Sequence, residues 1–554
     1  MVKKSGDFSD KIKAYALKNA VEFGKADVGK IISKLFQHGL EKKDIKKIMP
    51  KVLEIVKEVN SLSSEEKEKA FVRYFKHVKI RKEKEKGLPE LPEVKGKPVF
   101  RVAPFPSGAL HLGNAKTFLL NAMYSEKYKG KLILVMDDTI GSAEKQIDKD
   151  SYELIKEAFK WLGIKYAGKI YYKSDRLKIY YDFAEELIRK GKAYVCECER
   201  ETLRENRVKG IECSCRQYNI KEQLKRWKEM FDRKQGEAVL RIKTNMMDSN
   251  PAFRDRVLFR ISEREHPRVK KKYKVWPTLE MSWAIDDHLL GITHIIRGND
   301  LMIESDMEKF IWDVFKWKHP VIIHTGLINI GGIGPKISKS KAQKEVRSGK
   351  FLGWDDPRTW SIQSLERRGF KKKALREFVK QFGIKNQDIT IPIESLYAIN
   401  RKLIDSTSNR YSFVENELKL NMGVRTREIK VPVHPDKKKT RKIKVKKSIF
   451  ISKKDFKKFK GKEIRLIHLN NVKLSGRNTS KVTSLENKDI PKINWVSGGV
   501  KCRILMPLGI WVDGIAEEGI KELKIGDIIQ FERFGFCRFD KKNKNVYEFW
   551  FAHK

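Results

Sequence analysis

The stretch Arg101–Asn114 reads RVAPFPSGALHLGN, and the apolar run Pro98–Phe100 precedes it. This order predicts a strand, then a glycine-containing loop, then a helix that begins near the end of the stretch. Gly108 and Gly113 allow the backbone to approach a ligand closely, and His111 lies where loop and helix meet. Free N–H groups and the dipole at a helix N-terminus attract anions. The stretch therefore predicts a phosphate-binding turn after a strand.

A second segment, Lys336–Ser340 (KISKS), follows a glycine run at 331–334. Its two ammonium groups, Lys336 and Lys339, can close over a phosphate chain if the loop is mobile. The alternative interpretation is purely structural, with His111 as a helix cap and the lysines on a solvated loop. Each segment alone is weak evidence, and the two together are much stronger.

Together these segments resemble the HIGH-type and KMSKS-type signatures of class I aminoacyl-tRNA synthetases. Asp286–Gly298 (DDHLLGITHIIRG) is similar to a stretch of glutamyl- and glutaminyl-tRNA synthetases, and Gly353–Arg358 (GWDDPR) to their archaeal and eukaryotic branch. Tyr397–Asp405 and Phe531–Arg538 resemble the archaeal-type glutamyl enzymes. The likeness runs from about Val94 to the C-terminus. It implies ATP-dependent ligation of L-glutamate to tRNA(Glu) through a glutamyl-adenylate, and leaves open whether tRNA(Gln) is also charged.

The resemblance also implies roles for particular residues. His111 would donate to phosphate oxygens and Lys339 would bridge the leaving pyrophosphate, with Lys336 as a second catalytic cation. Mg²⁺ would accompany ATP. The implied ATP-binding residues are Ser107, Gly108, His111, Gly113, Asn114, Ser338 and Lys339. The implied amino-acid-binding residues are Arg101, Ala103, Asp137 and Arg297, the arginines for carboxylates and Asp137 for the ammonium.

Two alternatives concern the pocket. Without a ligand, Arg101 and Arg297 would be surface ion-pair residues, because burying an unpaired arginine is costly. Four positions also depart from the family pattern and leave the amino-acid specificity open: Phe105, Val135, Ile140-Gly141 and Leu279. The alternative functions are therefore a glutaminyl-tRNA synthetase and a non-catalytic tRNA-binding paralogue. The retained histidine and lysines argue against the paralogue.

Four cysteines form a CxC pair, fourteen residues, and a second CxC pair: Cys196, Cys198, Cys213 and Cys215. In reducing surroundings this set predicts a structural zinc site, although a spacing of one residue is tighter than the common CxxC. The alternative is four buried or free thiols. Zinc here resembles that of several relatives, and it would brace the inserted domain without taking part in catalysis.

The pattern along the chain predicts a multidomain α/β protein, with a Rossmann-type catalytic domain, a strand at Lys131–Met136 and helices at Ser151–Leu162 and Leu177–Lys190. A capping box is expected at Ser63 and Glu66. The predicted domains are a helical N-terminal extension (1–93), the first catalytic half (94–192), an inserted acceptor-stem-binding domain with the zinc site (193–268), the second catalytic half with KISKS (269–345), a helical stem-contact region (346–410) and an all-β anticodon-binding barrel region (411–554).

Composition supports a polyanionic partner. Lys plus Arg number 120 against 72 Asp plus Glu, a formal net charge of +48, which favours nucleic acid, although a genome rich in lysine would contribute too. The chain has no apolar run long enough to cross a bilayer, and its N-terminus lacks the apolar core of a signal peptide. We therefore expect a cytoplasmic protein, a monomer without membrane contact.

Overall fold

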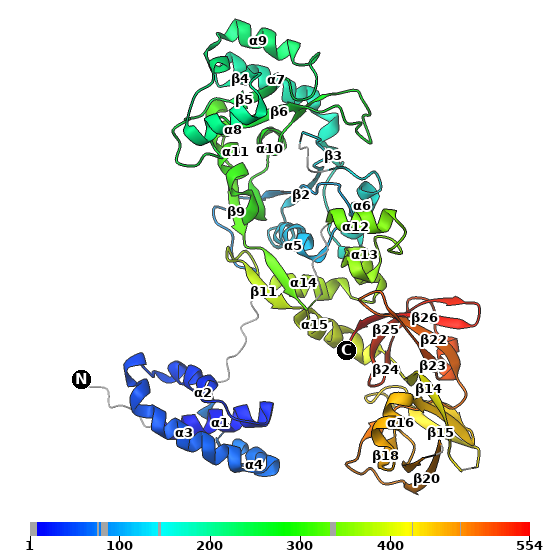
Figure 1. Cartoon of the computed structure of the whole chain (residues 1–554). Coiled ribbons are helices and arrows are strands. Elements are labelled where there is room, and N and C mark those ends of the chain that lie inside the picture. The colour runs from blue at the N-terminus through cyan, green and yellow to red at the C-terminus, as the bar shows by residue number, and fades with distance from the viewer. Residues whose placement is uncertain are drawn as a thin grey trace. The chain divides into compact units, whose positions relative to one another are not determined.

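The computed structural model describes residues 8–74, 77–78, 87–141, 146–332, 339–423, 425–476 and 478–554. The chain divides into two compact units, Met1–Lys86 and Gly87–Lys554 (Figure 1). Each unit contains a hydrophobic core of its own. Among the described helices, none combines the length and the apolarity needed to cross a membrane.

The first unit is a small helical bundle whose core lies between α1, α2 and α3. The predicted capping box is confirmed at α4: the Ser63 N–H donates to Glu66 Oε2 at 2.8 Å, and the Glu66 N–H donates to Ser63 Oγ at 3.3 Å. Pro50 lies inside α3. The helices are α1 (Ser9–Phe23), α2 (Val28–Leu35), α3 (Ile45–Ser61) and α4 (Ser64–Tyr74).

The second unit is built on a five-stranded parallel sheet in the order β3-β2-β1-β8-β9. One apolar core covers the face with α5 and α6, and another covers the face with α7, α10 and α11. The strands are β1 (Val99–Val102), β2 (Lys131–Met136), β3 (Tyr171–Tyr172), β8 (His294–Gly298) and β9 (Val321–Thr325). The helices are α5 (Leu112–Lys127), α6 (Ser151–Leu162), α7 (Leu177–Arg189), α10 (Leu279–Leu289) and α11 (Met302–Phe315).

Two sequence-based boundaries were wrong in detail. The sequence pattern predicts that the sheet resumes over 281–296, but residues 279–289 form the helix α10, and the strand begins only at His294. Apolar residues on all sides of this helix are buried, which hides its helical period. Helix α5 begins at Leu112, earlier than expected, because His111 already caps it.

An antiparallel sheet, β4-β5-β6-β7, interrupts the parallel one and packs into its second core. Its last strand, Val275–Pro277, lies beyond residue 268, where we expected the insertion to end. The insertion contains β4 (Ala193–Cys196), α8 (Arg200–Lys209), α9 (Ile220–Glu229), β5 (Val239–Ile242), β6 (Val257–Ile261) and β7.

After the parallel sheet the chain is mostly helical, and one arginine joins this region to the strands that follow. Arg367 donates to Asp355 at 2.6 Å, and to both carboxylate oxygens of Asp540 at 2.8 and 2.7 Å. Asp540 belongs to β25, so the arginine links two layers of the unit. The elements here are β10 (Ile328–Gly331), α12 (Lys339–Arg347), α13 (Ile362–Arg367), α14 (Lys372–Lys380), β11 (Ile389–Pro392) and α15 (Glu394–Ile404).

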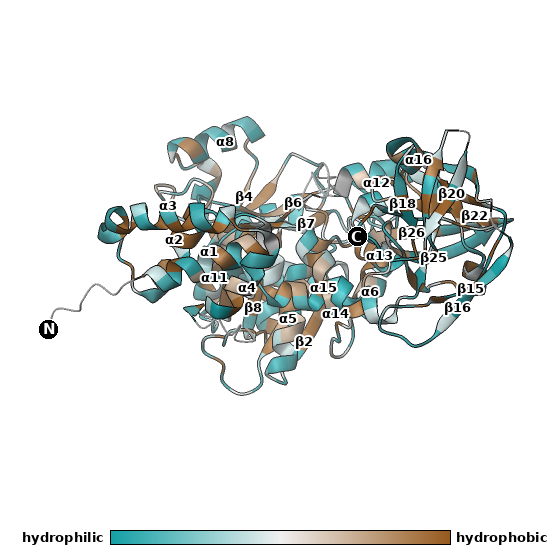
Figure 2. Cartoon of the chain, turned by 90° about the horizontal axis from the view of Figure 1, so that it is seen from below, coloured by the Kyte–Doolittle hydropathy of each residue, from teal (hydrophilic) through white to brown (hydrophobic). Residues whose placement is uncertain are grey.

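The C-terminal region is rich in strands, which carry apolar residues (brown) beside polar ones (teal) in Figure 2. Trp495 and Phe536, two of its aromatic residues, are buried in the sheets. A seven-stranded sheet contains β12 (Arg410–Tyr411), β24 (Ile528–Phe531), β25 (Gly535–Asn543), β26 (Val546–His553), β22 (Val500–Leu505), β23 (Trp511–Ala516) and β13 (Phe413–Glu415). A six-stranded sheet contains β17 (Ser448–Ser452), β14 (Glu417–Asn421), β20 (Thr479–Ser484), β19 (Asn471–Ser475), β18 (Glu463–Leu466) and β21 (Lys492–Ile493), and α16 (Lys453–Phe459) packs beside it.

A separate two-stranded ribbon, β15 (Arg427–Pro432) with β16 (Thr440–Val445), presents lysines to solvent. Lys430 lies directly opposite Lys442 across the ribbon, and Glu428 lies opposite Lys444. Lys442 Nζ pairs with Glu428 Oε1 at 3.2 Å, so part of this positive charge is balanced within the ribbon. Lys430 and Lys444 remain exposed beside it.

Candidate active site

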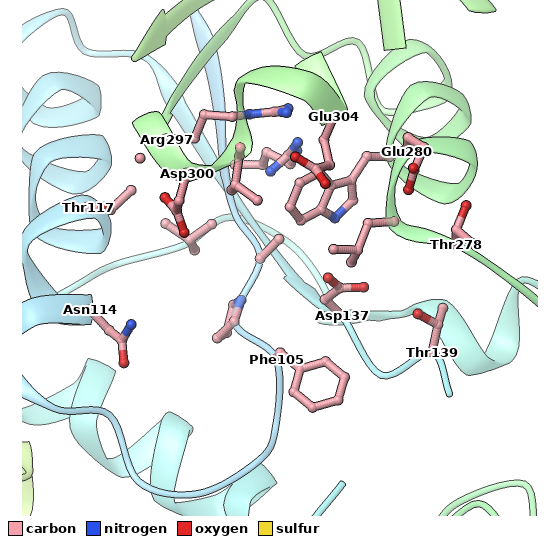
Figure 3. Close-up of a pocket in the computed structure, with 18 of the residues that line it drawn as sticks. Phe105, Asn114, Thr117, Asp137, Thr139, Thr278, Glu280, Arg297, Asp300 and Glu304 are labelled. Carbon is pink, nitrogen blue, oxygen red and sulfur yellow. The ribbon is translucent and has the colours of Figure 1, made fainter. Parts of the chain in front are cut away.

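A pocket of about 670 Å³ opens where the parallel strands end. The loop that contains His111 lines one side, and the start of α10 and the loop after β8 line another. In Figure 3, Arg297, Asp300 and Glu304 face the same space as Asp137 and Thr139. Because the carboxyl ends of parallel strands meet at one edge, residues far apart in sequence converge there.

His111 combines the two roles that the sequence left open. It is the N-cap of α5, where its Nδ1 accepts a hydrogen bond from the Asn114 N–H at 3.4 Å, and its side chain also lines the pocket. A Cβ on Gly113 would lie 3.1 Å from the histidine ring. Gly108 has φ +147°, and a Cβ there would lie 2.5 Å from the ring of Trp354. Both glycines are therefore needed for this loop to close around the pocket.

Most of the expected ATP-binding residues are found together. Ser107, Gly113 and Asn114 line the pocket, whereas Gly108 packs beneath Trp354. The buried Oδ1 of Asn114 has no hydrogen-bond partner within the part of the chain that the structure describes.

The lysine loop is described only in part. Lys336 and Ser338 lie outside the described residues, and Lys339 is the first residue of α12. That helix is fixed near the histidine loop through Asp148, which accepts from Gln343 Nε2 at 2.7 Å and donates its N–H to the Pro106 carbonyl at 2.9 Å.

The two arginines line the pocket, and both are paired inside the protein. Arg101 makes a two-pronged ion pair with Asp287 at 2.5 and 2.9 Å. Arg297 does the same with Glu308 at 2.8 and 2.6 Å. Both arginines are buried, with 6% and 3% exposure, so the alternative that they are surface ion-pair residues is wrong about the surface, although both are ion-paired. Among described residues the Nε–H of Arg297 has no acceptor, so one donor is left for a carboxylate.

Asp137 and Ala103 line the pocket as expected, and Asp137 is paired with Lys173 at 2.9 Å. Sequence reasoning missed Lys173, and it also missed Trp283. The Trp283 ring has Arg101, Lys173 and Arg297 within 4.7, 4.9 and 4.9 Å of its centroid. Trp283 precedes Asp287 by one helical turn, and this spacing could have indicated a shared face with the arginine's partner.

The four departures from the family pattern are not equivalent. Phe105 and Leu279 line the pocket, and so does Gly141, where a Cβ would lie 2.7 Å from the Pro277 carbonyl oxygen. Val135 is instead buried in the second core. Three of these positions can therefore affect the choice of amino acid directly.

A ring of arginines from the insertion lies at the pocket as well. Arg207, Arg256 and Arg260 line it, and Arg256 pairs with Glu280 and, at 2.8 Å, with Glu304. The insertion therefore contributes positive charge to the same pocket.

The four cysteines converge in the insertion, with their sulfur atoms all within 4.8 Å of one another. Cys196 and Cys213 are 3.6 Å apart, and Cys198 and Cys215 are 4.0 Å apart. Tetrahedral zinc with bonds of about 2.3 Å places sulfurs about 3.8 Å apart, so the spacing fits that ion. We find no disulfide between these cysteines.

The surroundings favour a thiolate. A hydrogen bond from Cys196 lowers the pKa of Cys213, and Tyr194 and Arg241 lower it further. The same hydrogen bond, together with burial, raises the pKa of Cys196. Arg241 Nη1 lies 3.8 Å from both sulfur atoms, so it can offset part of the negative charge that four thiolates bring to a zinc ion.

A family model described as "tRNA synthetases class I (E and Q), catalytic domain" matches residues 98–406. The chain belongs to this family. Two models for the anti-codon binding domain of these synthetases match residues 408–488 and 488–540. These matches confirm the resemblance and the fold class: a class I catalytic domain followed by strand-rich, near-barrel anticodon-binding domains. Class I synthetases use ATP with Mg²⁺.

Curated relatives of this synthetase align over nearly the whole chain. It is 41% identical to the glutamate--tRNA ligase of Thermococcus kodakarensis and 42% identical to that of Pyrococcus furiosus, over 98% of both chains in each case. It is 37% identical to the glutamate--tRNA ligase of Methanocaldococcus jannaschii, over 98% of this chain and 100% of the relative. The archaeal glutamyl likeness is therefore confirmed over the full length.

Proposed function

We propose that the protein is a glutamate--tRNA ligase, which joins L-glutamate to tRNA(Glu) and converts ATP to AMP and pyrophosphate. The observation that carries this is the single pocket that joins an anion-binding helix start to paired arginines and a buried aspartate. Full-length identity of about 40% to glutamate--tRNA ligases supports glutamate over glutamine. A binding-only paralogue would have no need of this pocket.

In the first step the α-carboxylate of glutamate attacks the α-phosphate of ATP, and the bond to pyrophosphate breaks. His111 and the N–H groups at the start of α5 hold phosphate oxygens, while Lys339 and Lys336 offset the charge that grows on pyrophosphate. When bound with ATP, Mg²⁺ would supply further positive charge to the phosphates. In the second step a terminal ribose hydroxyl of the tRNA attacks the activated carbonyl, and AMP leaves. The work of the protein is alignment and charge stabilisation.

The pocket accounts for an acidic amino acid. The unpaired Nε–H of Arg297 can donate to a substrate carboxylate, and such charge-assisted bonds are stronger than neutral ones. The guanidinium of Arg101, 4.7 Å from the centroid of the Trp283 ring, adds positive charge to the pocket. Asp137 would accept from the α-ammonium, at the opposite end of the substrate from the carboxylates.

The remaining assignments concern partners. The ribbon β15–β16 would contact tRNA phosphates, since its exposed lysines position RNA without reading bases. We assign Zn²⁺ to the four cysteines, as a brace for the inserted sheet. We also propose that the protein is a monomer, and light scattering of the purified protein tests this.

The deciding experiment charges separate tRNA(Glu) and tRNA(Gln) transcripts with labelled glutamate and with labelled glutamine. Glutamate on tRNA(Glu) is the expected product, and the tRNA(Gln) reaction shows whether charging extends to that tRNA. Glutamine on tRNA(Gln) would overturn the substrate assignment. The Lys339→Ala variant is the control: it should lose charging and still bind tRNA. Tight tRNA binding without any product from the unmodified protein would favour a binding-only role.

A further inference from the structure

Lys173 is a lysine with no exposed side-chain surface, and it lies behind the pocket. It follows β3 in a short 3-10 helix (Lys173–Asp175). Its Nζ lies 2.9 Å from Asp137 Oδ1 and donates to Ser282 Oγ at 2.8 Å. A buried ammonium group is costly unless it is paired and hydrogen-bonded, so this placement needs an explanation.

Asp137 is held from both sides. Its backbone N–H donates to the Pro104 carbonyl at 3.1 Å, which attaches it to the loop that leads to His111. Its Oδ1 forms an ion pair with Lys173 Nζ at 2.9 Å that lacks hydrogen-bond geometry, and within the described ranges no hydrogen bond reaches its Oδ2. Since Asp137 lines the pocket, Oδ2 is the oxygen available to a ligand.

The other charges near Lys173 already have partners. Asp286 accepts from Arg176 Nε at 2.7 Å and from Tyr180 Oη at 2.7 Å. Burial lowers the pKa of Lys173, and the attraction of Asp137 and Asp286 opposes this. Arg101 is bound to Asp287 and repels Lys173. Asp137 is therefore the carboxylate that Lys173 contacts directly.

We infer that Lys173 is a positioning residue for the amino-acid substrate: by holding Oδ1 of Asp137, it directs Oδ2 toward the α-ammonium. This rests on the proposed function and on the ammonium role of Asp137. The pair also keeps Asp137 from swinging toward Arg101, where it would compete with the substrate carboxylate. The Trp283 ring contacts Lys173 and both arginines, with the three cationic groups 4.7 to 4.9 Å from its centroid, so the two ends of the substrate site share one aromatic residue.

The test compares two variants. Lys173→Met keeps roughly the length of the side chain and has no hydrogen-bond donor, whereas Lys173→Gln keeps a donor and has no charge. In full-length protein, K173M should raise the KM for glutamate about tenfold, because a buried carboxylate loses its partner. The KM values for ATP and tRNA should change less than about twofold. K173Q should restore part of the glutamate affinity, since an amide N–H can still hold Oδ1.

A deaminated analogue separates positioning from general damage. Glutarate has both carboxylates and no ammonium, so its inhibition constant should be the same in wild type and K173M. Lys116→Met is the matched control: this lysine is also buried and donates to the Gly326 carbonyl, and its side chain does not line the pocket. K116M should lower the unfolding temperature and leave the KM for glutamate unchanged.

An unchanged KM for glutamate in K173M, or a rise matched by glutarate, would overturn the inference. If K173M does not fold, K173Q decides. A KM for glutamate that rises more than the KM for ATP, with an unchanged inhibition constant for glutarate, supports the inference. Equal rises in the two KM values contradict it. Wild-type charging tests the proposed function separately. If wild type charges glutamate and K173M has the same KM for glutamate, only the role of Lys173 is overturned, and the proposed function stands.

Discussion

At the scale of single residues, the pocket is a set of buried charges that satisfy one another and still leave atoms for a ligand. Arg297 shows this most clearly, because its fork is occupied by Glu308 while its Nε–H has no acceptor within the described chain. A guanidinium holds its N–H donors in a fixed plane on separate nitrogens, whereas a lysine carries all its donors on one nitrogen at the end of a flexible stem. The geometry therefore requires arginine at this position, and a positive charge alone is insufficient.

The first prediction follows from that geometry. Arg297→Lys keeps a charge beside Glu308 and removes the Nε–H, so charging kinetics should show a KM for glutamate raised about tenfold, with the KM for ATP nearly unchanged. Arg297→Ala should also destabilise the fold, by about 3–5 kcal/mol, since Glu308 would be left buried and unpaired. Equal KM for glutamate in wild type and R297K would contradict the role of the Nε–H.

The second prediction concerns Gly108. Gly108→Ala places a methyl group against Trp354 at a backbone angle that side chains rarely adopt. We expect a loss of about 1–3 kcal/mol in urea unfolding and a higher KM for ATP, because the loop to His111 must move. Gly96→Ala is the matched control, since Gly96 also has positive φ (+67°) and open space around it. Similar effects in both variants would show that backbone strain, and not the Trp354 contact, is responsible.

The sequence predicted the residues of the pocket better than their pairing. The glycine loop, His111 and the arginines could be identified because they form short motifs. Arg101 and Asp287 are separated by 186 positions, and no local pattern indicates that such residues form an ion pair. Lys173 was missed for the same reason: its burial depends on three elements that meet only in the fold.

At the scale of elements, two kinds of pattern were reliable guides. Helix Ser151–Leu162, which has one buried face, and strand Lys131–Met136, a continuous apolar run, were predicted with the bounds found in the structure. Helix α10 was missed because it is buried nearly all round. The spacing of the cysteines in the sequence predicted a metal site in the insertion. The distances between the sulfur atoms agree with this prediction.

The third prediction is that the insertion contains about one zinc per chain, measured by elemental analysis. Cys213→Ser should reduce the zinc content and lower the unfolding temperature, and a chelator should do the same to wild type, because the sheet loses its brace. Cys502→Ala is the control: this cysteine is buried in the seven-stranded sheet, and its loss should not change the metal content. A full complement of zinc in C213S would contradict the assignment.

The fourth prediction concerns His553 at the end of β26. Its Nδ1 donates to the Lys554 carbonyl, and its Nε2 accepts from the Asn400 amide at 2.9 Å, whose oxygen is fixed by the Lys371 N–H. Burial lowers the pKa of His553 from 6.5 to about 4. As the pH falls, the unfolded chain takes up the proton first.

Stability should therefore be full above about pH 6.5 and should fall between about pH 6.5 and 4, by on the order of 3 kcal/mol from this residue. Urea unfolding of wild type at several pH values measures how steeply the free energy of unfolding depends on pH. His553→Gln, which keeps a hydrogen-bonding amide and cannot titrate, should show a shallower slope in that range. The same slope in both proteins would mean that His553 does not contribute.

At the scale of the whole molecule, charge and domain order decide what the protein binds. The fifth prediction is that replacing Lys430, Lys442 and Lys444 with glutamine weakens tRNA binding and reduces the slope of log K against log salt by roughly 0.7–0.9 per lost phosphate contact. The control replaces Lys129, Lys131 and Lys165, which are exposed at the opposite end of the parallel sheet from the pocket. Equal effects of the two triple variants would indicate only non-specific attraction.

Arg367 has a consequence for how such proteins can be recombined. One guanidinium donates to Asp355 in the catalytic layer and to Asp540 in the C-terminal sheet. Residues 355, 367 and 540 therefore depend on one another across a domain border. A chimaera that takes its anticodon-binding part from a relative without a carboxylate at 540 would leave this arginine half satisfied. Grafts that transfer 355, 367 and 540 together should tolerate the exchange, whereas grafts cut at the domain border alone should not.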